Sequence, residues 1–220
     1  MQSWLQKLEY KYGRRGGIPN LMIILIAGQL LMYVAYNLGM YNLLGMISLT
    51  RSGVLHGQVW RLITFVFMPS NGSNPLFFLL YLYCEYWIGM ALERAWGNFR
   101  FTVYVAAGIV GAWLACLLTG WSDNLGIYYS LFFAFACLYP EQQLLLFFVI
   151  PIKVKWIGLF SGALYLLQIL TMPGLLNKLS LVLALSGFLL FFGQDLWHDG
   201  INSYRNYKRR RDWQNQWKNR

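Results

Sequence analysis

The sequence predicts an all-α integral membrane protein, and three observations support this fold class. First, 58% of the 220 residues are hydrophobic and only 12% are charged, which is too apolar for an ordinary soluble domain. Second, the hydrophobic residues gather in runs long enough to cross a bilayer as helices. Third, the basic residues are concentrated at the two ends and in short breaks between the runs, as in the cytoplasmic flanks of membrane proteins.

Six apolar runs are predicted to form transmembrane helices. The first follows a basic segment, residues 1–18, and is long enough to be a retained helix instead of a removable signal peptide. The fourth and fifth are short for helices in contact with lipid, so we expect neighbouring helices or a locally thinner bilayer to shield them. The predicted helices are 19–38, 75–92, 101–119, 125–139, 156–171 and 179–196. They make up a membrane domain of residues 19–197, followed by a tail of residues 198–220.

The distribution of lysine and arginine predicts that both ends of the chain lie in the cytoplasm. Of the 18 basic residues, fifteen then fall on the cytoplasmic side and three, Arg51, Arg61 and Lys178, fall outside. An even number of helices returns the chain to its starting side. The tail interleaves basic and aromatic residues, which suits binding to anionic lipid, and a docking site for a cytosolic partner is the alternative. This pattern does not favour binding to nucleic acid.

Two connections are unusual. Residues 41–73 form a long outside segment of glycine, aromatic and apolar residues, which we expect to fold into the membrane interface. Residues 140–155 contain an apolar run that is too short to span, and we expect it to lie along the cytoplasmic interface. The cysteines lack metal-ligand spacing, so we expect packing roles for them and no metal or cofactor. They are Cys84, Cys116 and Cys137.

Three parts of the sequence match motifs at the spacing found in one family of membrane proteins. The first is residues 57–64 (Gly-Gln-Val-Trp-Arg-Leu-Ile-Thr), and the second is residues 91–97 (Ala-Leu-Glu-Arg-Ala-Trp-Gly). The third comprises residues 138–140 and 147–151. They resemble, in this order, the Trp-Arg segment of the long first outside loop, the Leu-Glu-x-x-x-Gly turn that ends the second helix, and the connection between the fourth and fifth helices of the rhomboid superfamily. Active members of that superfamily cut peptide bonds within the membrane. The resemblance implies a six-helix rhomboid-like bundle.

The resemblance also implies that the catalytic dyad is lost. An active rhomboid uses a serine in a Gly-x-Ser-Gly motif that opens the fourth helix and a histidine in the sixth helix. The family's spacing puts Leu125 at the position of the nucleophile and Ser180, or a near neighbour, at that of the base. Phe77 and Tyr81 stand where polar residues of the second helix serve the oxyanion. A leucine cannot attack a carbonyl, so the resemblance implies an inactive member, related in kind to the Derlins and iRhoms.

The two histidines support this interpretation without an alignment. His56 lies in the outside loop, and His198 lies at the cytoplasmic end of the sixth helix. Ser130 is the only serine of the fourth helix, whereas His198 lies about eighteen residues beyond Ser180, roughly 27 Å along a helix toward the wrong face. A dyad of Ser130 and His198 is therefore geometrically implausible, and Ser130 is expected to pack or to bond within its helix.

Glu85 is the most conspicuous polar residue of the predicted spans, because a carboxylate inside a bilayer is costly without a partner. Phe77, Tyr81 and Glu85 are spaced four apart, which predicts one shared helical face. Either Glu85 lines a remaining cavity and contacts a polar client segment or a proton, or it is a protonated or hydrogen-bonded structural residue. The candidates for a client cavity are Phe77, Tyr81, Glu85, Leu125, Gly126 and Ser130.

Other residues are expected to have structural roles. Trp60 and Arg61 are expected to anchor the outside loop at the lipid headgroups, with client recognition as the alternative. A cytoplasmic latch is expected from the charged residues Glu93, Arg94 and Arg100. Small residues are expected to allow close packing of helices, with a homodimer interface as the alternative. They are Gly108, Gly158, Gly162 and Gly187.

The leading hypothesis for function is a rhomboid-like pseudoprotease that binds transmembrane segments of client proteins and affects their stability, trafficking or degradation. The resemblance to inactive rhomboids implies this role. A divergent intramembrane serine protease is the first alternative, and a small membrane transporter is the second. The expected location is a bacterial inner membrane in preference to the endoplasmic reticulum, whereas the client and the oligomeric state are open.

Overall fold

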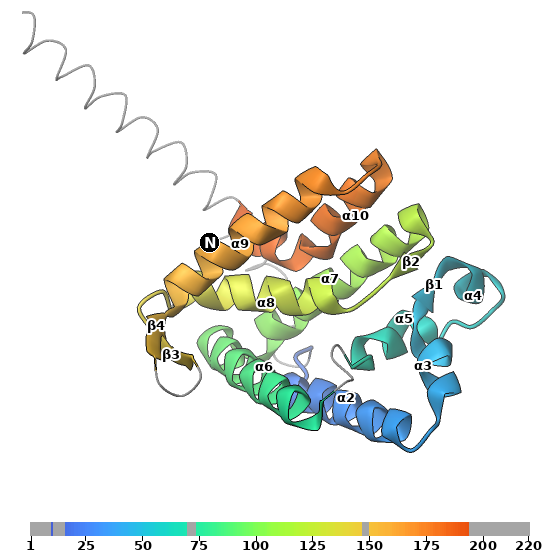
Figure 1. Cartoon of the computed structure of the whole chain (residues 1–220), viewed down its shortest axis with the longest axis horizontal. Helices are drawn as coiled ribbons and strands as arrows, with labels where there is room; N and C mark the ends of the chain where they lie inside the picture. Colours follow the sequence, from blue (N-terminus) through green and yellow to red (C-terminus); the bar gives the residue numbers. More distant parts are fainter. Residues whose placement is uncertain (1–9, 11–15, 70–73, 147–149, 194–220) are drawn as a thin grey trace, which may run out of the picture.

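The computed structural model describes residue 10 and residues 16–69, 74–146 and 150–193. These residues are mostly helical (Figure 1). The basic tail, with its expected role in binding anionic lipid, lies outside the described residues.

Each predicted helix has a counterpart in the structure. The first five are single helices whose bounds agree with the predicted ones to within a few residues, because long apolar runs fix helix positions well. The predicted sixth helix begins earlier than expected and is broken, with segments 175–184 and 186–193 meeting at 64°. The helices are α2 (Leu21–Asn37), α6 (Pro75–Trp96), α7 (Asn98–Thr119), α8 (Leu125–Leu138), α9 (Val154–Thr171) and α10 (Leu175–Ala184).

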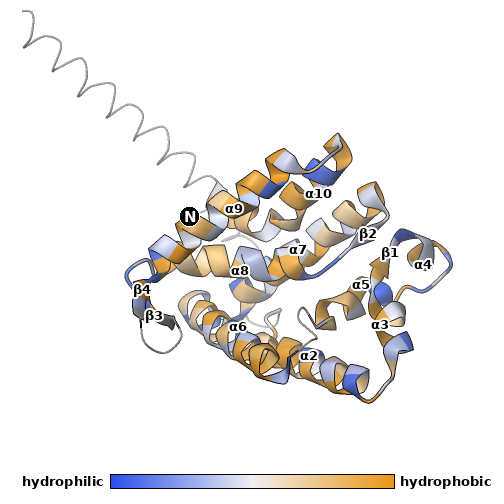
Figure 2. Cartoon of the chain, viewed as in Figure 1, coloured by the Kyte–Doolittle hydropathy of each residue, from blue (hydrophilic) through white to orange (hydrophobic). Residues whose placement is uncertain are grey.

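The lengths and apolar surfaces of these helices identify an all-α membrane protein. Within the described part of the chain, α6, α7 and α9 are each long and apolar enough to cross a bilayer. The bent pair that begins with α10 would make a fourth span, whereas α2 and α8 are apolar but shorter. Apolar residues cover the outer faces of the helices as well as the interior (Figure 2). Such outer faces are those of helices surrounded by lipid.

The long connection between α2 and α6 is a folded unit. It contains α3 (Tyr41–Ile47), β1 (Leu49–Thr50), α4 (Arg51–Leu55), α5 (Arg61–Thr64) and the 3₁₀ turn η1 (Phe65–Phe67). Strand β1 pairs antiparallel with β2 (Trp121–Ser122), which lies between α7 and α8. The Trp113 indole of α7 donates a hydrogen bond of 2.8 Å to the carbonyl of Leu62. The connection is thus attached to the C-terminal end of α7, close to the start of α8.

The connection between α8 and α9 is a β-hairpin, and its expected position along the cytoplasmic interface stays a prediction. Strands β3 (Gln143–Leu146) and β4 (Ile150–Lys153) pair antiparallel, with Gln143 opposite Lys153 and Leu146 opposite Ile150. The short apolar run thereby satisfies its backbone groups across two strands. At the base of the hairpin, Glu141 forms ion pairs with Lys153 and Lys155.

Glycines allow several helices to approach closely, as expected for three of the four predicted packing glycines. A Cβ atom at Gly108 would lie 3.2 Å from Ile127, one at Gly158 would lie 2.7 Å from Ala136, and one at Gly187 would lie 3.1 Å from the Tyr104 carbonyl. Gly162 is different, because no described atom outside the backbone of its own helix and its chain neighbours lies within 4 Å of the position of its Cβ. The expected packing role of Gly162 within the chain is therefore wrong.

Candidate functional site

The inward face of α6 carries Glu85, which is buried together with Phe78 and Leu82. Phe77, by contrast, is 62% exposed, so the expectation that Phe77 and Glu85 share one face is wrong. Each step of four residues overshoots a full turn by about 40°, so two steps rotate the side chain about 80° away. Phe77 therefore points out of the bundle, and Tyr81, halfway between them, is partly buried.

Glu85 has a partner that the sequence analysis missed. The Gln29 side chain, 0% exposed in the middle of α2, donates from Nε2 to Glu85 Oε2 at 3.1 Å and also to the Tyr128 hydroxyl of α8. Tyr128 in turn donates to the backbone carbonyl of Val66 in η1 at 3.2 Å. A polar residue inside the apolar run 19–38 was the available signal. We refer to Gln29, Glu85 and Tyr128 as the polar cluster.

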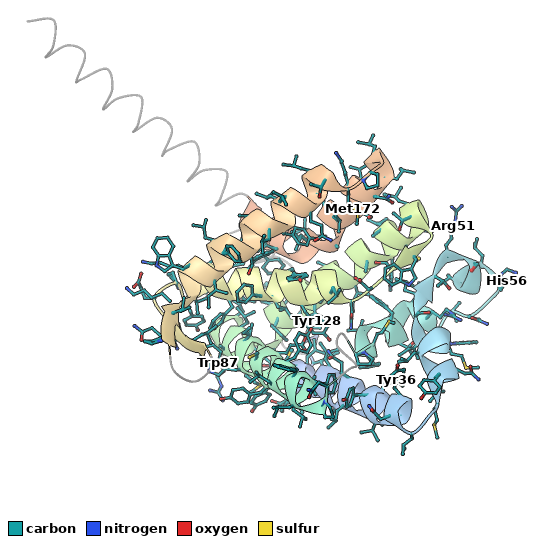
Figure 3. All side chains as sticks on the ribbon, viewed as in Figure 1. Tyr36, Arg51, His56, Trp87, Tyr128 and Met172 are labelled. Atoms are coloured by element: carbon teal, nitrogen blue, oxygen red, sulfur yellow. The ribbon has the colours of Figure 1, made fainter. Side chains whose placement is uncertain are left out.

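The polar cluster lies where three helices meet. Figure 3 shows Tyr128 between α8 and the pair formed by α6 and α2. Helix α2 approaches its neighbours closely, because a Cβ atom at Gly28 would meet the Phe67 ring and one at Gly89 of α6 would meet Met22. The Tyr81 side chain also forms a hydrogen bond with the Glu85 carboxyl group, so the expected proximity of Tyr81 and Glu85 is correct.

Some buried polar atoms of this region have no hydrogen-bond partner within the described ranges. They include Gln29 Oε1 and Glu85 Oε1, which belong to the two side chains joined by the bond between Nε2 and Oε2. The Tyr33 hydroxyl, one turn along α2 from Gln29, is the third. A buried polar atom without a hydrogen-bond partner costs free energy. These atoms therefore indicate that a partner other than the described protein heavy atoms, such as a proton or a water molecule, takes part in the cluster.

Asn124, which directly precedes α8, is a second residue that the sequence analysis did not select. Its side chain is buried and donates from Nδ2 to the carbonyls of Val66 at 3.0 Å and Met68 at 2.7 Å. Val66 thus accepts hydrogen bonds from both Tyr128 and Asn124. These hydrogen bonds join the start of α8 to the end of the long connection between α2 and α6. We call that segment the outer connection, after its expected side of the membrane.

The expected roles of Trp60 and Arg61 diverge. Trp60 is half exposed, and its anchoring role stays a prediction. Arg61 is only 9% exposed and turns into the outer connection, so the expected phosphate contact is wrong. Its guanidinium donates to the carbonyls of Gly45 and Ser48, each at 2.6 Å, and to Gln58 Oε1 at 2.6 Å. Nε and Nη1, two of the three guanidinium nitrogens that could bind a phosphate, are thus engaged within this connection.

The carboxyl group of Glu93 forms no hydrogen bond of the expected cytoplasmic latch within the described residues. Glu93 is buried, but neither of its carboxyl oxygens has a hydrogen-bond partner in the part of the chain that the structure describes. Arg94 is exposed on the next position of the helix. Successive residues of a helix point about 100° apart, so Arg94 is directed away from the side on which Glu93 is buried.

The positions expected to have lost catalytic residues show no nucleophile with a base. Leu125 opens α8, and Ser180 donates to the carbonyl of Asn177 within its own helix at 2.8 Å. Ser130 is fully buried and donates to the carbonyl of Ile127 at 2.7 Å, as expected for a serine that bonds within its helix. His56 lies at the far edge of the molecule from Tyr128 (Figure 3), and His198 lies outside the described residues.

The six residues expected to form a client cavity do not line one surface. Glu85, Gly126 and Ser130 are buried, whereas Phe77 and Leu125 are exposed. Gly126 packs against α10, where a Cβ atom would lie 2.9 Å from the Ala184 carbonyl. Among the described residues, no three His, Cys, Asp or Glu side chains come together in a way that could hold a metal ion.

Comparison with known proteins gives no match to a protein-family model, a curated protein or a solved structure.

Proposed function

We propose that the chain is a catalytically inactive, rhomboid-like membrane protein that binds transmembrane segments of client proteins and affects their stability or trafficking. The proposal includes six spanning helices, both chain ends in the cytoplasm and, for the host membrane, a bacterial inner membrane in preference to the endoplasmic reticulum. Support for the topology comes from the charge bias of the sequence and from the six apolar helical regions.

The observation that carries the binding role is a strip of side chains on α8 that the bundle covers only in part, with its exposed end at Leu125 and Tyr129. Leu125 and Tyr129 are exposed, the latter to 43%, and Phe132 and Ala136 are partly buried. Their spacing of four, three and four residues puts them on one face of α8. Other faces of the same helix are buried in the core, where Ile127, Leu131 and Ala134 are almost inaccessible. We call these four residues the α8 strip.

The α8 strip lies between α6 and α9. On one side, the Tyr128 ring packs edge-on against Tyr81 of α6 at 6.5 Å; on the other, the Tyr129 ring packs edge-on against Tyr165 of α9 at 5.7 Å. Figure 1 shows α6 and α9 on opposite sides of α8. The strip contains no charged residue, and its exposed end at Leu125 and Tyr129 suits van der Waals contact with an apolar helix, whereas Ala136 at the other end faces Gly158 of α9. On α9, the open space at Gly162 would let a helix backbone approach closely.

The state of Ser130 supports binding over proteolysis. A serine nucleophile needs an accessible hydroxyl and a base that takes its proton. Ser130 is buried with its hydroxyl already donating to Ile127, and its own carbonyl accepts a bond of 2.7 Å from Tyr104. The hydroxyl and the carbonyl of Ser130 are thus both engaged in hydrogen bonds within the core. A fluorophosphonate probe that labels the purified protein, with labelling lost in Ser130→Ala, would contradict this part of the proposal.

Photocrosslinking in native membranes tests the binding role. A photoreactive phenylalanine analogue is placed at Tyr129 or Phe132, and Leu170, an apolar residue of α9 that is 74% exposed, is the control position. We expect intact membrane proteins to be captured from the strip and not from Leu170, because lipid contacts alone would be similar at both. Equal capture from all positions, or cleavage of a transmembrane reporter without capture, would contradict the proposal.

A small transporter is the second candidate, because the apolar span that begins with α10 is broken between residues 184 and 186, and broken helices form ion sites in transporters. Nearby carbonyl oxygens at the break are already engaged: that of Leu181 accepts a bond of 2.8 Å from the Tyr165 hydroxyl, and that of Ala107 accepts one from Ser186. This arrangement favours a structural break. Ion or solute flux into liposomes that contain the purified protein, above that of empty liposomes, would favour the transporter.

A further inference from the structure

The side chains of Gln29 and Glu85 meet through only one of the two hydrogen bonds that such a pair can form. Gln29 Nε2 donates to Glu85 Oε2 at 3.1 Å, and its other hydrogen is directed to the Tyr128 hydroxyl. The remaining oxygens, Gln29 Oε1 and Glu85 Oε1, are buried and have no partner among the described residues. An amide oxygen and an ionised carboxylate oxygen are both acceptors, so they cannot bond to each other.

One proton resolves both unpartnered atoms. A neutral carboxylic acid has a hydroxyl donor next to its carbonyl oxygen, and a primary amide has an acceptor next to its donors. We propose that Gln29 and Glu85 form an intramembrane proton-binding site, in which protonated Glu85 Oε1 donates to Gln29 Oε1 while Gln29 Nε2 donates to Glu85 Oε2. The acid and the amide then close a cyclic pair of two hydrogen bonds, and the second amide hydrogen stays on Tyr128.

Among the described residues, the helices that pack against α6 place no charge beside Glu85 that would replace the proton. Helices α2 and α8, which pack against α6, contain no Asp, Glu, Lys, Arg or His. The charged residue of α7 is Arg100, near the start of that helix, and Glu85 lies eleven residues before the end of α6, roughly 17 Å away along its axis. The titratable groups that lie beside Glu85 among the described residues are the phenols of Tyr81 and Tyr128 and the neighbouring thiol of Cys84. A phenol and a thiol are ordinarily neutral at pH 7.

The proposed proton would hold four elements together. The hydrogen bonds connect α2 to α6 through Glu85, α2 to α8 through Tyr128, and α8 to η1 through the Val66 carbonyl. Loss of the proton would leave an ionised carboxylate facing an amide oxygen in the bundle, which favours separation of α2 from α6. This inference rests on the contacts of Gln29 and does not depend on client binding, so either can fail alone.

Infrared difference spectroscopy of the purified full chain in lipid nanodiscs tests the protonation state. The wild type minus Glu85→Gln spectrum at pH 7 should contain the C=O stretching band of a neutral carboxylic acid, shifted in D₂O. In Glu85→Gln the new amide can donate to Gln29 and accept from it, so this variant should keep the fold. Glu93→Gln, which changes a buried carboxyl one helix turn or more away, should retain the Glu85 band. A carboxylate band in the difference spectrum would overturn the proposal.

Thermal unfolding distinguishes a proton from a metal cation or a bridging water. The fold holds a proton that the unfolded chain releases at neutral pH, so the Tm of the wild type should fall as pH rises, and that dependence should be lost in Glu85→Gln. Gln29→Leu should lower the Tm of the wild type at pH 6 by more than it lowers that of Glu85→Leu, in which the pair is already absent. A Tm that rises with Na⁺ in the wild type only, or one that depends on pH equally in Glu85→Gln, would overturn the proposal.

Discussion

Asn124 and Val66 are joined across the outer side of the bundle by a hydrogen bond of 3.0 Å from Nδ2 to the carbonyl, and the same amide group also donates to Met68. Two backbone carbonyls at the end of the outer connection thus accept hydrogen bonds from one buried side chain that precedes α8. The first prediction concerns this residue.

Asn124→Ala is expected to lower the free energy of unfolding by about 1–3 kcal/mol, because it removes the donor of the Met68 carbonyl and leaves the Val66 carbonyl with the bond from Tyr128 alone. The measurement is urea or thermal unfolding in detergent. Asn177→Ala is the matched control, since Asn177 also donates from Nδ2 to a carbonyl, that of Pro173 at 2.8 Å, but in an exposed turn. Equal losses in the two variants would show that burial of Asn124 is not the cause.

Arg61→Lys should loosen the outer connection although the charge is kept. An ammonium group cannot reproduce the fork that reaches Gly45, Ser48 and Gln58, and each lost bond from a charged donor is worth about 1.5–3 kcal/mol. We expect faster limited proteolysis within residues 41–64. Arg51→Lys, at an exposed position of the same connection, should be cut by the protease at the wild-type rate. Faster cutting of both variants would contradict the structural role assigned to the Arg61 hydrogen bonds.

Tyr165→Phe tests whether a hydrogen bond from α9 stabilises the bend that follows α10. The variant removes only the hydroxyl that donates to the Leu181 carbonyl, so the expected loss is about 0.6–1.5 kcal/mol. Tyr83→Phe removes a hydroxyl from a side chain that is 65% exposed and should be neutral. Unfolding in a lipid-like detergent measures both. A neutral Tyr165→Phe would mean that the bend does not need this bond.

Gly126→Ala and Gly162→Ala are expected to differ sharply. The added methyl group at Gly126 would clash with Ala184 of α10, including its backbone, which costs about 1–3 kcal/mol when the neighbour cannot move away. The methyl group at Gly162 would enter open space, so this variant should keep wild-type stability. If binding of a client helix uses the space at Gly162, crosslinking from Tyr129 should decrease in Gly162→Ala while the Tm stays the same.

Glu141 gives a prediction for low pH outside the spanning helices. Hydrogen bonds from Lys153 and Lys155 lower the pKa of Glu141 to about 2. A carboxyl group with a lowered pKa contributes stability that is present above its unfolded pKa and is lost as the pH falls toward the folded value. The NMR titration of the labelled carboxyl should therefore have its midpoint near 2, and Lys153→Met should raise it. Because the group is exposed, added salt should raise the midpoint as well.

Hydropathy was sufficient for the placement of the helices, because the apolar runs dominate the sequence. It could not indicate the break at Leu185, since both halves of the broken helix are equally apolar. It also missed Gln29, whose single polar group is averaged out in a run of seventeen helical residues. The direction of a polar side chain is decided by distant partners. Arg61 could face lipid phosphate or loop carbonyls with the same local sequence, and only the fold of residues 41–64 selects the carbonyls.

The pairing of Leu49 with Ser122 imposes an order on biogenesis. The two short strands lie on either side of α6 and α7 in the chain, so neither strand can find its partner until both helices have been inserted as a hairpin across the bilayer. The connection between α2 and α6 can therefore be completed only after β2 has followed α7. A nascent chain stalled before residue 121 would carry an unfinished outer face.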